Sequence, residues 1–369
     1  MDVLMTALQP GGGIKTFFRY IYGQECYEDC VFTLFAPDHG LSDYLDKCLG
    51  KNKIRLIESP EEPLSFVREL RTVLKKTSSD LVHSHGFGAG LLTEVSRTGL
   101  KRRHLMTAHD VFLDSQFDGG VGSVKKFVMA RLFQRIDAIH TVTEDATENF
   151  RTFFSNVPAK RLYPILHGVD TDYFANEPSS DLRAQLGEGE DTRLVGFFGR
   201  FMGQKGFRTL VDAIAELKSA EFMPLPKVVT FGWGGYIRED YQYIEEKGLS
   251  EQFIQMPGTD NMPSMIKAVD MVVMPSRWEA CGLLAMEVLS AGIPLLSSDC
   301  IGLREVVAGS PARTFLPGDH ARLADLIRKE AEQSSKQEFA DYQSIAVRRF
   351  GIARPAQELR ALYDQLVGS

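Results

Sequence analysis

The chain contains few cysteines, and their positions do not suggest a cross-linked or metal-bound fold. Among its 369 residues are five cysteines, none of which forms a Cys-x-x-Cys pair. An odd number of scattered thiols is not typical of a disulfide framework or a zinc site. Reduced thiols are typical of a cytoplasmic protein. The cysteines are Cys26, Cys30, Cys48, Cys281 and Cys300.

Long apolar stretches and an excess of positive charge are also missing. No run of about 18 uncharged apolar residues occurs, so we expect no membrane-spanning helix, and the first residues lack the pattern of a signal peptide. The net charge is −7, whereas proteins that bind nucleic acid usually carry a basic excess. Residues 1–165 carry 21 basic and 20 acidic side chains, and the remainder carries 21 and 29. We therefore expect a cytoplasmic protein with no nucleic-acid partner, whose first half better suits an anionic partner.

Short apolar runs alternate with longer amphipathic ones along the whole chain. Strands separated by helices predict parallel sheets with right-handed crossovers. The pattern occurs twice, on either side of a polar connection at 170–192. We therefore expect an α/β protein of two doubly wound, Rossmann-like domains, 1–170 and 171–354, facing each other across a cleft, with a helix at 355–369 crossing back onto the first domain. The predicted strands are 3–8, 31–35, 54–57, 81–84, 105–108, 138–142, 194–198, 228–231, 253–256, 271–274, 294–297 and 314–316.

The most specific signal follows the predicted strand 271–274. Glu279 stands just before a predicted helix that begins near Gly282, and Glu287 lies on that helix. The first turn of a helix offers unpaired N–H groups and the positive end of a dipole, which suit a phosphate. Glu279 can accept hydrogen bonds from sugar hydroxyls, and Glu287 from a ribose diol. The alternative, two solvated glutamates, is disfavoured by the apolar surroundings.

Glycine turns follow two further strands. Gly199 ends one strand, and Arg200 and Lys205 flank the turn that follows, where they can converge on a diphosphate. The alternative is a pair of solvent-facing cations that close a loop. Gly12 and Gly13 follow the first strand, where a tight turn without a ligand is equally consistent with the sequence. Neither segment is a GxxxxGK[ST] loop or a complete GxGxxG fingerprint.

Histidines end two other predicted strands. His109 follows strand 105–108, where it can bind a sugar hydroxyl or transfer a proton. A structural histidine is the alternative. We interpret His83 as structural and His85 as lining the cleft.

Taken in order, these motifs resemble the retaining glycosyltransferases of family 4, which have the GT-B fold. The resemblance covers nearly the whole chain, and its most specific part is the E-x7-E motif that Glu279 and Glu287 match. The other matching segments are Gly12-Gly13, Asp80 to His85, His109-Asp110, His167 to Asp170, Gly199-Arg200, Lys205-Gly206, Gly232 to Gly234 and Pro275-Ser276.

The resemblance implies an enzyme that transfers a hexose-type sugar from a nucleotide-diphospho-sugar, a UDP- or GDP-sugar, to a glycan or lipid-linked acceptor in polysaccharide or lipopolysaccharide biosynthesis. It implies no metal or other cofactor. Glu287 would bind the ribose, and the first turn of its helix would help the cations bind the diphosphate. The implied catalytic residues are His109, Arg200, Lys205 and Glu279; the implied donor-binding residues are Gly12, Gly13, Arg200, Lys205, Glu279, Cys281, Gly282, Leu283, Leu284 and Glu287.

The chain departs from the family pattern at two places. His167 stands where the family often has Asn, and Ala280-Cys281-Gly282 stands where it often has Pro-Phe-Gly, which leaves the donor sugar open. A nucleotide-sugar epimerase, a sugar phosphorylase, a dehydrogenase and a non-catalytic sugar-nucleotide-binding protein stay open as alternatives.

Basic residues of the first domain form a candidate face for peripheral contact with an anionic membrane, at the inner side of the cell membrane. Ordinary solvated charges are the alternative. The residues are Lys101, Arg102, Arg103, Lys125, Lys126, Arg131 and Arg135.

Overall fold

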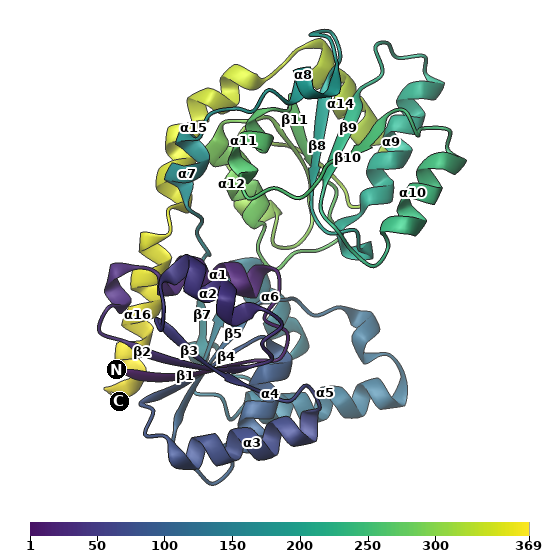
Figure 1. Cartoon of the computed structure of the whole chain (residues 1–369). Helices are drawn as coiled ribbons and strands as arrows, with labels where there is room; N and C mark the ends of the chain where they lie inside the picture. Colours follow the sequence, from purple (N-terminus) through teal and green to yellow (C-terminus); the bar gives the residue numbers. More distant parts are fainter. Residues whose placement is uncertain (369) are drawn as a thin grey trace. The chain divides into compact units, whose positions relative to one another are not determined.

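The computed structural model describes residues 1–368. The chain forms two compact α/β units (Figure 1). Unit 1 comprises residues 1–168 together with the segment that starts at Ile352, and unit 2 comprises residues 169–351. Each unit is described separately below.

Unit 1 is built on a parallel sheet. Within the described residues the sheet has seven strands in the order β3-β2-β1-β4-β5-β6-β7. The first six lie within two residues of their predicted positions. The strand β7 was not predicted, because three residues are too few to show a periodic pattern. The strands are β1 (Asp2–Ala7), β2 (Val31–Ala36), β3 (Ile54–Glu58), β4 (Leu81–His85), β5 (Arg103–Ala108), β6 (Ala138–Thr141) and β7 (Leu162–Pro164).

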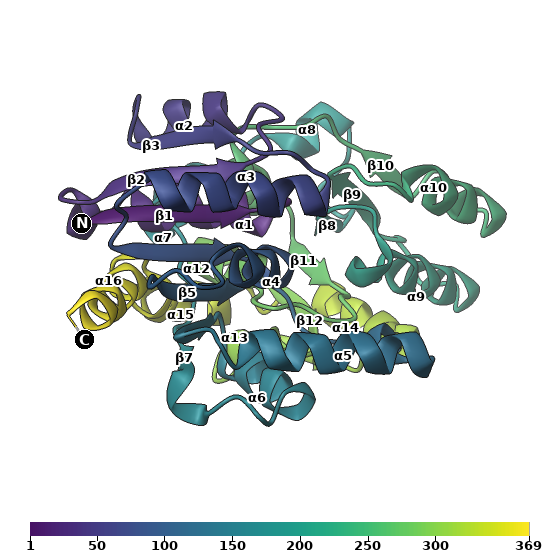
Figure 2. The same cartoon turned by 90° about the horizontal axis from the view of Figure 1, so that it is seen from below.

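Helices cover both faces of this sheet, as Figures 1 and 2 show. Alternate residues of each strand enter different cores: in β1, Val3 and Met5 pack beneath α1 and α16, and Leu4 packs against α3. A further core lies between the sheet and α5 and α6. The helices are α1 (Gly13–Tyr22), α2 (Leu41–Leu49), α3 (Pro63–Lys76), α4 (Phe87–Ser96), α5 (Gly119–Phe133), α6 (Glu144–Phe153) and α16 (Ala353–Val367).

The C-terminal helix α16 packs on unit 1 against α1 and β4 (Figure 1). Arg360 forms an ion pair with Asp29 and donates a hydrogen bond to the carbonyl of Cys26 at 2.8 Å. The helix begins two residues before the predicted range 355–369 and ends at Val367. The last residue of that range, Ser369, lies outside the described residues.

Unit 2 repeats this architecture. Its parallel sheet has the strand order β10-β9-β8-β11-β12-β13, and every strand lies within one residue of its prediction. Helices α9, α10 and α14 share a core with one face of the sheet. The strands are β8 (Leu194–Phe198), β9 (Lys227–Phe231), β10 (Phe253–Gln255), β11 (Met271–Met274), β12 (Leu295–Ser298) and β13 (Arg313–Phe315). The helices are α7 (Thr171–Asn176), α8 (Leu182–Leu186), α9 (Phe207–Ser219), α10 (Ile237–Glu246), α11 (Met262–Lys267), α12 (Leu283–Ala291), α13 (Arg304–Val307), α14 (His320–Glu332) and α15 (Lys336–Phe350).

The polar stretch 170–192 is more ordered than a simple connection. It contains α7 and α8, and the side chains of Asp170 and Asp181 cap these helices by accepting N–H groups of Tyr173 and Ala184. An N-terminal aspartate cap stabilises even a short helix. In the part of the chain that the structure describes, no helix has both the length and the apolar character needed to cross a lipid bilayer.

A chain of hydrogen bonds runs through the interior of unit 1. Strand register places Thr107 between His85 and His140. His140 Nε2 lies 3.0 Å from the carbonyl of Ile165, and its Nδ1 lies 3.0 Å from the Thr107 hydroxyl. Because a carbonyl can only accept, Nε2 carries the proton and Nδ1 accepts from Thr107. The Thr107 oxygen, 2.7 Å from His83 Nε2, then accepts from that ring.

These histidines are therefore neutral. His83 continues the chain of hydrogen bonds to the hydroxyls of Tyr22 and Tyr363, at 3.1 Å and 2.5 Å. Burial lowers the pKa of His140 to about 4. It also lowers the pKa of His167, whose Nδ1 donates to the carbonyl of Gly168, to about 4. A second proton on His83 or His140 would face a hydroxyl that already donates to that ring nitrogen. A second proton on the buried Nε2 of His167 would find no acceptor among the described residues.

Unit 1 is expected to lose stability on mild acidification. The unfolded chain binds protons at histidine near pH 6.5, whereas folded His140 and His167 bind them only near pH 4. Stability therefore falls as the pH drops from about 6.5 to about 4, and each residue costs about 2 kcal/mol at pH 5.

Urea unfolding followed by circular dichroism at several pH values measures this effect. The variant His140→Gln, which keeps a donor for Ile165 but does not titrate, should lose about 2 kcal/mol less than wild type between pH 7 and pH 5. An identical pH dependence of the two proteins would contradict the prediction.

Candidate active site

The candidate residues of unit 2 follow the two strands at which the strand order reverses. Strands β8 and β11 are neighbours in the sheet, although the intervening strands β9 and β10 lie to one side of them. Ligands of open parallel sheets bind beyond the carboxyl ends of the strands at such a reversal. Arg200 and Lys205 follow β8, and Glu279 follows β11.

The structure joins Lys205 and Glu279 directly. Lys205 Nζ lies 2.6 Å from Glu279 Oε1, and the Ser276 hydroxyl donates to the same oxygen at 2.7 Å. The Glu279 side chain is only 8% exposed, and that of Lys205 is 25% exposed. A carboxylate this deeply buried needs a compensating cation. The pair therefore holds a lysine ammonium and a glutamate carboxylate at fixed positions on the carboxyl edge of the sheet.

Two glycines let the loops approach closely enough for this contact. Gly206 has φ +64°, and a Cβ atom there would lie 2.0 Å from the carbonyl oxygen of Pro275. Gly302 has φ +77°, and its Cβ atom would lie 2.3 Å from the carbonyl oxygen of Glu279. Both conformations and both approaches exclude other side chains. The first contact brings together the loops that carry Lys205 and Glu279.

Helix α12 begins at Leu283 with Gly282 as its N-cap, as predicted, and ends before Gly292 in the left-handed conformation. The Gly282 N–H donates to the carbonyl of Gly302 at 3.2 Å, and the Leu283 N–H donates to that of Cys281 at 3.0 Å. Two of the backbone groups expected to face a ligand are thus used within the chain. Leu284 is the next amide along the first turn.

Glu287 lies one turn further along α12. Residues three and four apart share one side of a helix, so Glu287 lies on the same side as Leu283 and Leu284. All three are partly exposed, whereas Ala285 and Met286 are buried. The carboxylate is therefore on the accessible side of the helix.

Arg200 is not part of the ion pair. It is exposed, and within residues 1–368 its guanidinium makes no ion pair and no hydrogen bond. The backbone on either side is fixed, because the Gly199 N–H donates to Phe231 and the Phe201 N–H donates to Trp233. An anchored backbone with an unpaired guanidinium suits an anionic ligand.

Three residues near the pair were not predicted. The Ser298 hydroxyl donates to the carbonyl of Ser276 at 2.5 Å and so supports the residue that holds Glu279. Cys300 is buried beside them, and burial together with the Glu279 carboxylate raises the pKa of its thiol to about 11. The third is Gly302. All three end or follow β12, so the strand-end signal that identified Glu279 would also have found them.

In unit 1, the predicted glycines occupy the start of α1. Gly12 is the N-cap with φ +54°, which favours glycine, and Gly13 is the first residue of the helix. A Cβ atom on Gly13 would meet no atom of the chain within 4 Å. Internal packing therefore does not require glycine at position 13, and space for a ligand remains there.

His109 lies at the end of β5 and is partly exposed. Its Nε2 lies 3.2 Å from His85 Nδ1, and the Phe17 ring packs edge-on against it. Burial and the neighbouring histidines His140 and His167 lower its pKa well below the usual value, so the ring is neutral. The prediction that His85 lines a cleft was wrong, because His85 is 1% exposed and faces the interior beneath α1.

Among residues 1–368, no three His, Cys, Asp or Glu side chains gather in a way that could hold a metal ion.

Models of glycosyltransferase families match both halves of the chain. The model "Glycosyltransferase Family 4" matches residues 24–173, and the model "Glycosyl transferases group 1" matches residues 179–345. A lipopolysaccharide core biosynthesis mannosyltransferase of Rhizobium meliloti is 26% identical over 245 residues, which is 64% of this chain and 68% of the relative. An Escherichia coli UDP-Gal:alpha-D-GlcNAc-diphosphoundecaprenol alpha-1,3-galactosyltransferase is 24% identical over 291 residues, 74% and 73% of the two chains.

Solved structures share the whole fold. Anabaena HepE in complex with UDP-glucose superposes with a TM-score of 0.85 over 99% of this chain and 100% of that one, at 21% identity. This similarity and the two parallel-sheet units establish the GT-B architecture. With family models matched over both halves, the chain belongs to the family 4 glycosyltransferases.

Proposed function

We propose that the protein transfers a hexose-type sugar, with retention of configuration and without a metal, from a UDP- or GDP-sugar to a glycan or lipid-linked acceptor of polysaccharide or lipopolysaccharide biosynthesis. The observation that carries the proposal is the Lys205–Glu279 pair at the carboxyl edge of the unit 2 sheet, close in sequence to the N-terminus of α12. The relatives named for lipopolysaccharide core and undecaprenol-linked substrates support this class of acceptor.

The donor diphosphate would bind the two cations and the Leu284 N–H in the first turn of α12. Arg200, which is exposed and unpaired within the described residues, would form charge-assisted hydrogen bonds with it. Lys205 would share its ammonium between Glu279 and the phosphate. Glu287 would accept the ribose hydroxyls from its place one turn into the helix. In unit 1, we propose that Gly13 gives room to the phosphates and that neutral His109 bonds the sugar.

The reaction would proceed by attack on the face from which the diphosphate departs. The acceptor oxygen forms a bond to the anomeric carbon while the bond from that carbon to the diphosphate oxygen breaks. The departing phosphate oxygen takes the proton of the acceptor hydroxyl. Arg200 and Lys205 stabilise the negative charge that grows on the diphosphate, and Glu279 orients the sugar.

Calorimetric titration with UDP-, GDP- and ADP-sugars, beside NAD and with EDTA present, tests the donor site. One nucleotide-sugar should bind, and Glu287→Gln should weaken it by about 1.5–3 kcal/mol, because a charged acceptor of the ribose is lost. Glu245→Gln, at an exposed position of α10, is the matched control. Unchanged donor affinity in Glu287→Gln would contradict the assignment of Glu287 to the ribose. Binding of NAD and of no nucleotide-sugar would contradict the proposed transferase activity.

Removing the two cations should have different effects on stability. Arg200→Ala should reduce kcat at least about tenfold, with a smaller loss of donor affinity and little change in unfolding temperature, because its contacts strengthen as charge develops. Lys205→Ala should also cost roughly 1–3 kcal/mol of stability, because it leaves Glu279 buried without its cation. Steady-state kinetics and thermal unfolding measure both effects. Wild-type turnover in Arg200→Ala would contradict its role.

The anomeric configuration of the product tests retention. Nuclear magnetic resonance of the early product should show the configuration of the donor, with the same rate in EDTA as in buffer containing magnesium. An inverted product, or activity abolished by EDTA and restored by the metal, would each refute the corresponding part of the proposal.

A further inference from the structure

Helix α5 of unit 1 has apolar side chains on both sides. Met129 and Phe133 point inward and are buried in a core with Phe150 and Phe154. A second apolar set points outward to solvent. Its members are Val121, 87% exposed, Val124, 64%, Phe127, 61%, and Val128, 49%.

The outward side chains form a continuous stripe. Val121, Val124 and Val128 are spaced by three and four residues, which places them along one side of the helix, and Phe127 lies beside Val124 on the next turn. Single exposed apolar residues are normal on a protein surface, whereas a contiguous patch indicates a binding face.

Within α5 itself the charged side chains are all positive, and the N-cap residue Asp118 directly precedes the helix. Residues 119–133 include Lys125, Lys126 and Arg131 and contain no Asp or Glu. The Arg131 guanidinium lies 5.2 Å from the Phe127 ring centre, so its stem runs along the apolar stripe. Long basic side chains in this position can cover apolar surface and place their charge at its edge.

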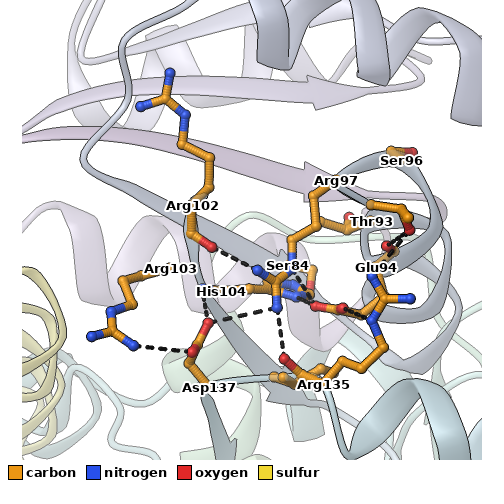
Figure 3. Close-up of polar contacts among 12 residues, drawn as sticks. Ser84, Thr93, Glu94, Ser96, Arg97, Arg102, Arg103, His104, Arg135 and Asp137 are labelled. Carbon is orange, nitrogen blue, oxygen red and sulfur yellow. Dashed lines mark hydrogen bonds and ion pairs between the residues drawn. The ribbon is translucent and has the colours of Figure 1, made fainter. Parts of the chain in front are cut away.

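More cations gather just beyond the C-terminal end of α5 (Figure 3). Arg135 follows the helix, and its carbonyl accepts a hydrogen bond from Arg97 Nη2 at 2.6 Å. Beside them is a pocket of about 380 Å³. The pocket is lined by Arg97, Lys101, Arg102, Arg103 and Asp137.

One buried and one partly exposed carboxylate hold this basic cluster in place. Glu94, whose side chain is fully buried, pairs with Arg97 Nε at 2.5 Å, with Arg135 Nε at 3.4 Å and with the His104 ring at 2.6 Å. Hydrogen bonds from His104 and Arg97 lower the pKa of Glu94 more than burial raises it, so it is ionised. Asp137 pairs with Arg103 at 3.3 Å.

The cations outnumber these two acids. In Figure 3, Arg97 and Arg135 turn toward Glu94, whereas Arg102 and Arg103 point away from it. Lys101 is exposed, and the side chains of Arg103 and Arg135 are 45% and 44% exposed. The rim of the pocket therefore presents fixed positive charge to solvent.

We propose that the outward side of α5, together with the exposed cations Lys101, Arg103 and Arg135, is a docking face for an anionic lipid bilayer. The apolar stripe would enter the boundary between headgroups and acyl chains, and the cations at its flank and end would bind lipid phosphates. This docking face does not depend on the identity of the sugar donor.

A second copy of the chain fits this face less well. A two-fold dimer through α5 would gather the cations Lys125, Lys126 and Arg131 of both copies at one interface, and α5 itself has no carboxylate to compensate them. An anionic bilayer offers acyl chains to the apolar stripe and phosphate groups to the positive rim.

Co-sedimentation of the full chain with lipid vesicles tests the proposal. Wild-type protein should bind vesicles of phosphatidylcholine and phosphatidylglycerol at low salt, and vesicles of phosphatidylcholine alone much more weakly. The variant Val124→Glu/Phe127→Glu should bind at least about tenfold more weakly, because it places two charges in the inserted stripe. Lys125→Gln/Arg131→Gln should lose affinity only for the anionic vesicles.

Matched controls separate docking from folding and from catalysis. Leu64→Glu changes another apolar residue of unit 1, 66% exposed on α3, and should bind vesicles as wild type does. The α5 variants should keep the wild-type unfolding temperature and donor affinity, since they alter exposed positions away from the donor residues.

Two results would overturn the proposal. One is that the wild-type protein does not sediment with anionic vesicles at low salt, or that Val124→Glu/Phe127→Glu binds them as tightly as wild type does. The other result is a wild-type dimer in light scattering that becomes a monomer in Val124→Glu/Phe127→Glu, while neither protein sediments with vesicles. That result would assign the face to a second copy of the chain. Vesicle binding is read without turnover, so failure of the proposed transferase activity would leave it standing.

Discussion

The buried carboxylate of Glu279 is the constraint on which the candidate site of unit 2 depends. Its side chain is only 8% exposed, and burial of a carboxylate costs free energy that the Lys205 ammonium, 2.6 Å away, offsets. That contact requires the loops after β8 and β11 to touch. Gly206 permits the approach, since any Cβ atom there would collide with Pro275. The fold therefore places a fixed pair of opposite charges at the carboxyl edge of the unit 2 sheet, where we propose that the hydroxyls and the diphosphate of the donor bind.

The histidines His83 and His140 in the interior of unit 1 are held by hydrogen bonds, whereas the buried Glu94 of the same unit is held by ion pairs. The carbonyl of Ile165 determines the tautomer of His140, because it can only accept a hydrogen bond. That tautomer makes the Thr107 hydroxyl donate to His140, and the Thr107 oxygen then accepts a hydrogen bond from His83 Nε2. A network with one consistent direction keeps each ring neutral. The partly exposed His109, hydrogen-bonded to His85 beside this network, is therefore held as a neutral imidazole that can donate or accept a single bond.

The two faces proposed to bind ligands in unit 1 lie at opposite edges of its sheet. Gly12 and His109 follow strands β1 and β5 at the carboxyl edge, where ligands of such sheets bind. Arg103 begins β5, and Asp137 directly precedes β6, so the basic pocket lies at the amino edge. Helix α5 leads toward that edge, because β6 starts soon after it. A face that binds a bilayer here would leave the carboxyl edge of the same sheet free.

The sequence alone determined the succession of strands and helices and the residue types at the strand ends. Buried parallel strands are apolar runs, the proline Pro63 marks the first residue of α3, and the glycine Gly292 follows the last residue of α12. These signals are local. Only the tertiary structure decided that Lys205 pairs with Glu279, 74 positions away, that His85 is buried, and that one apolar side of α5 is left uncovered. Periodicity shows which residues share a face, but contacts between distant segments decide what covers that face.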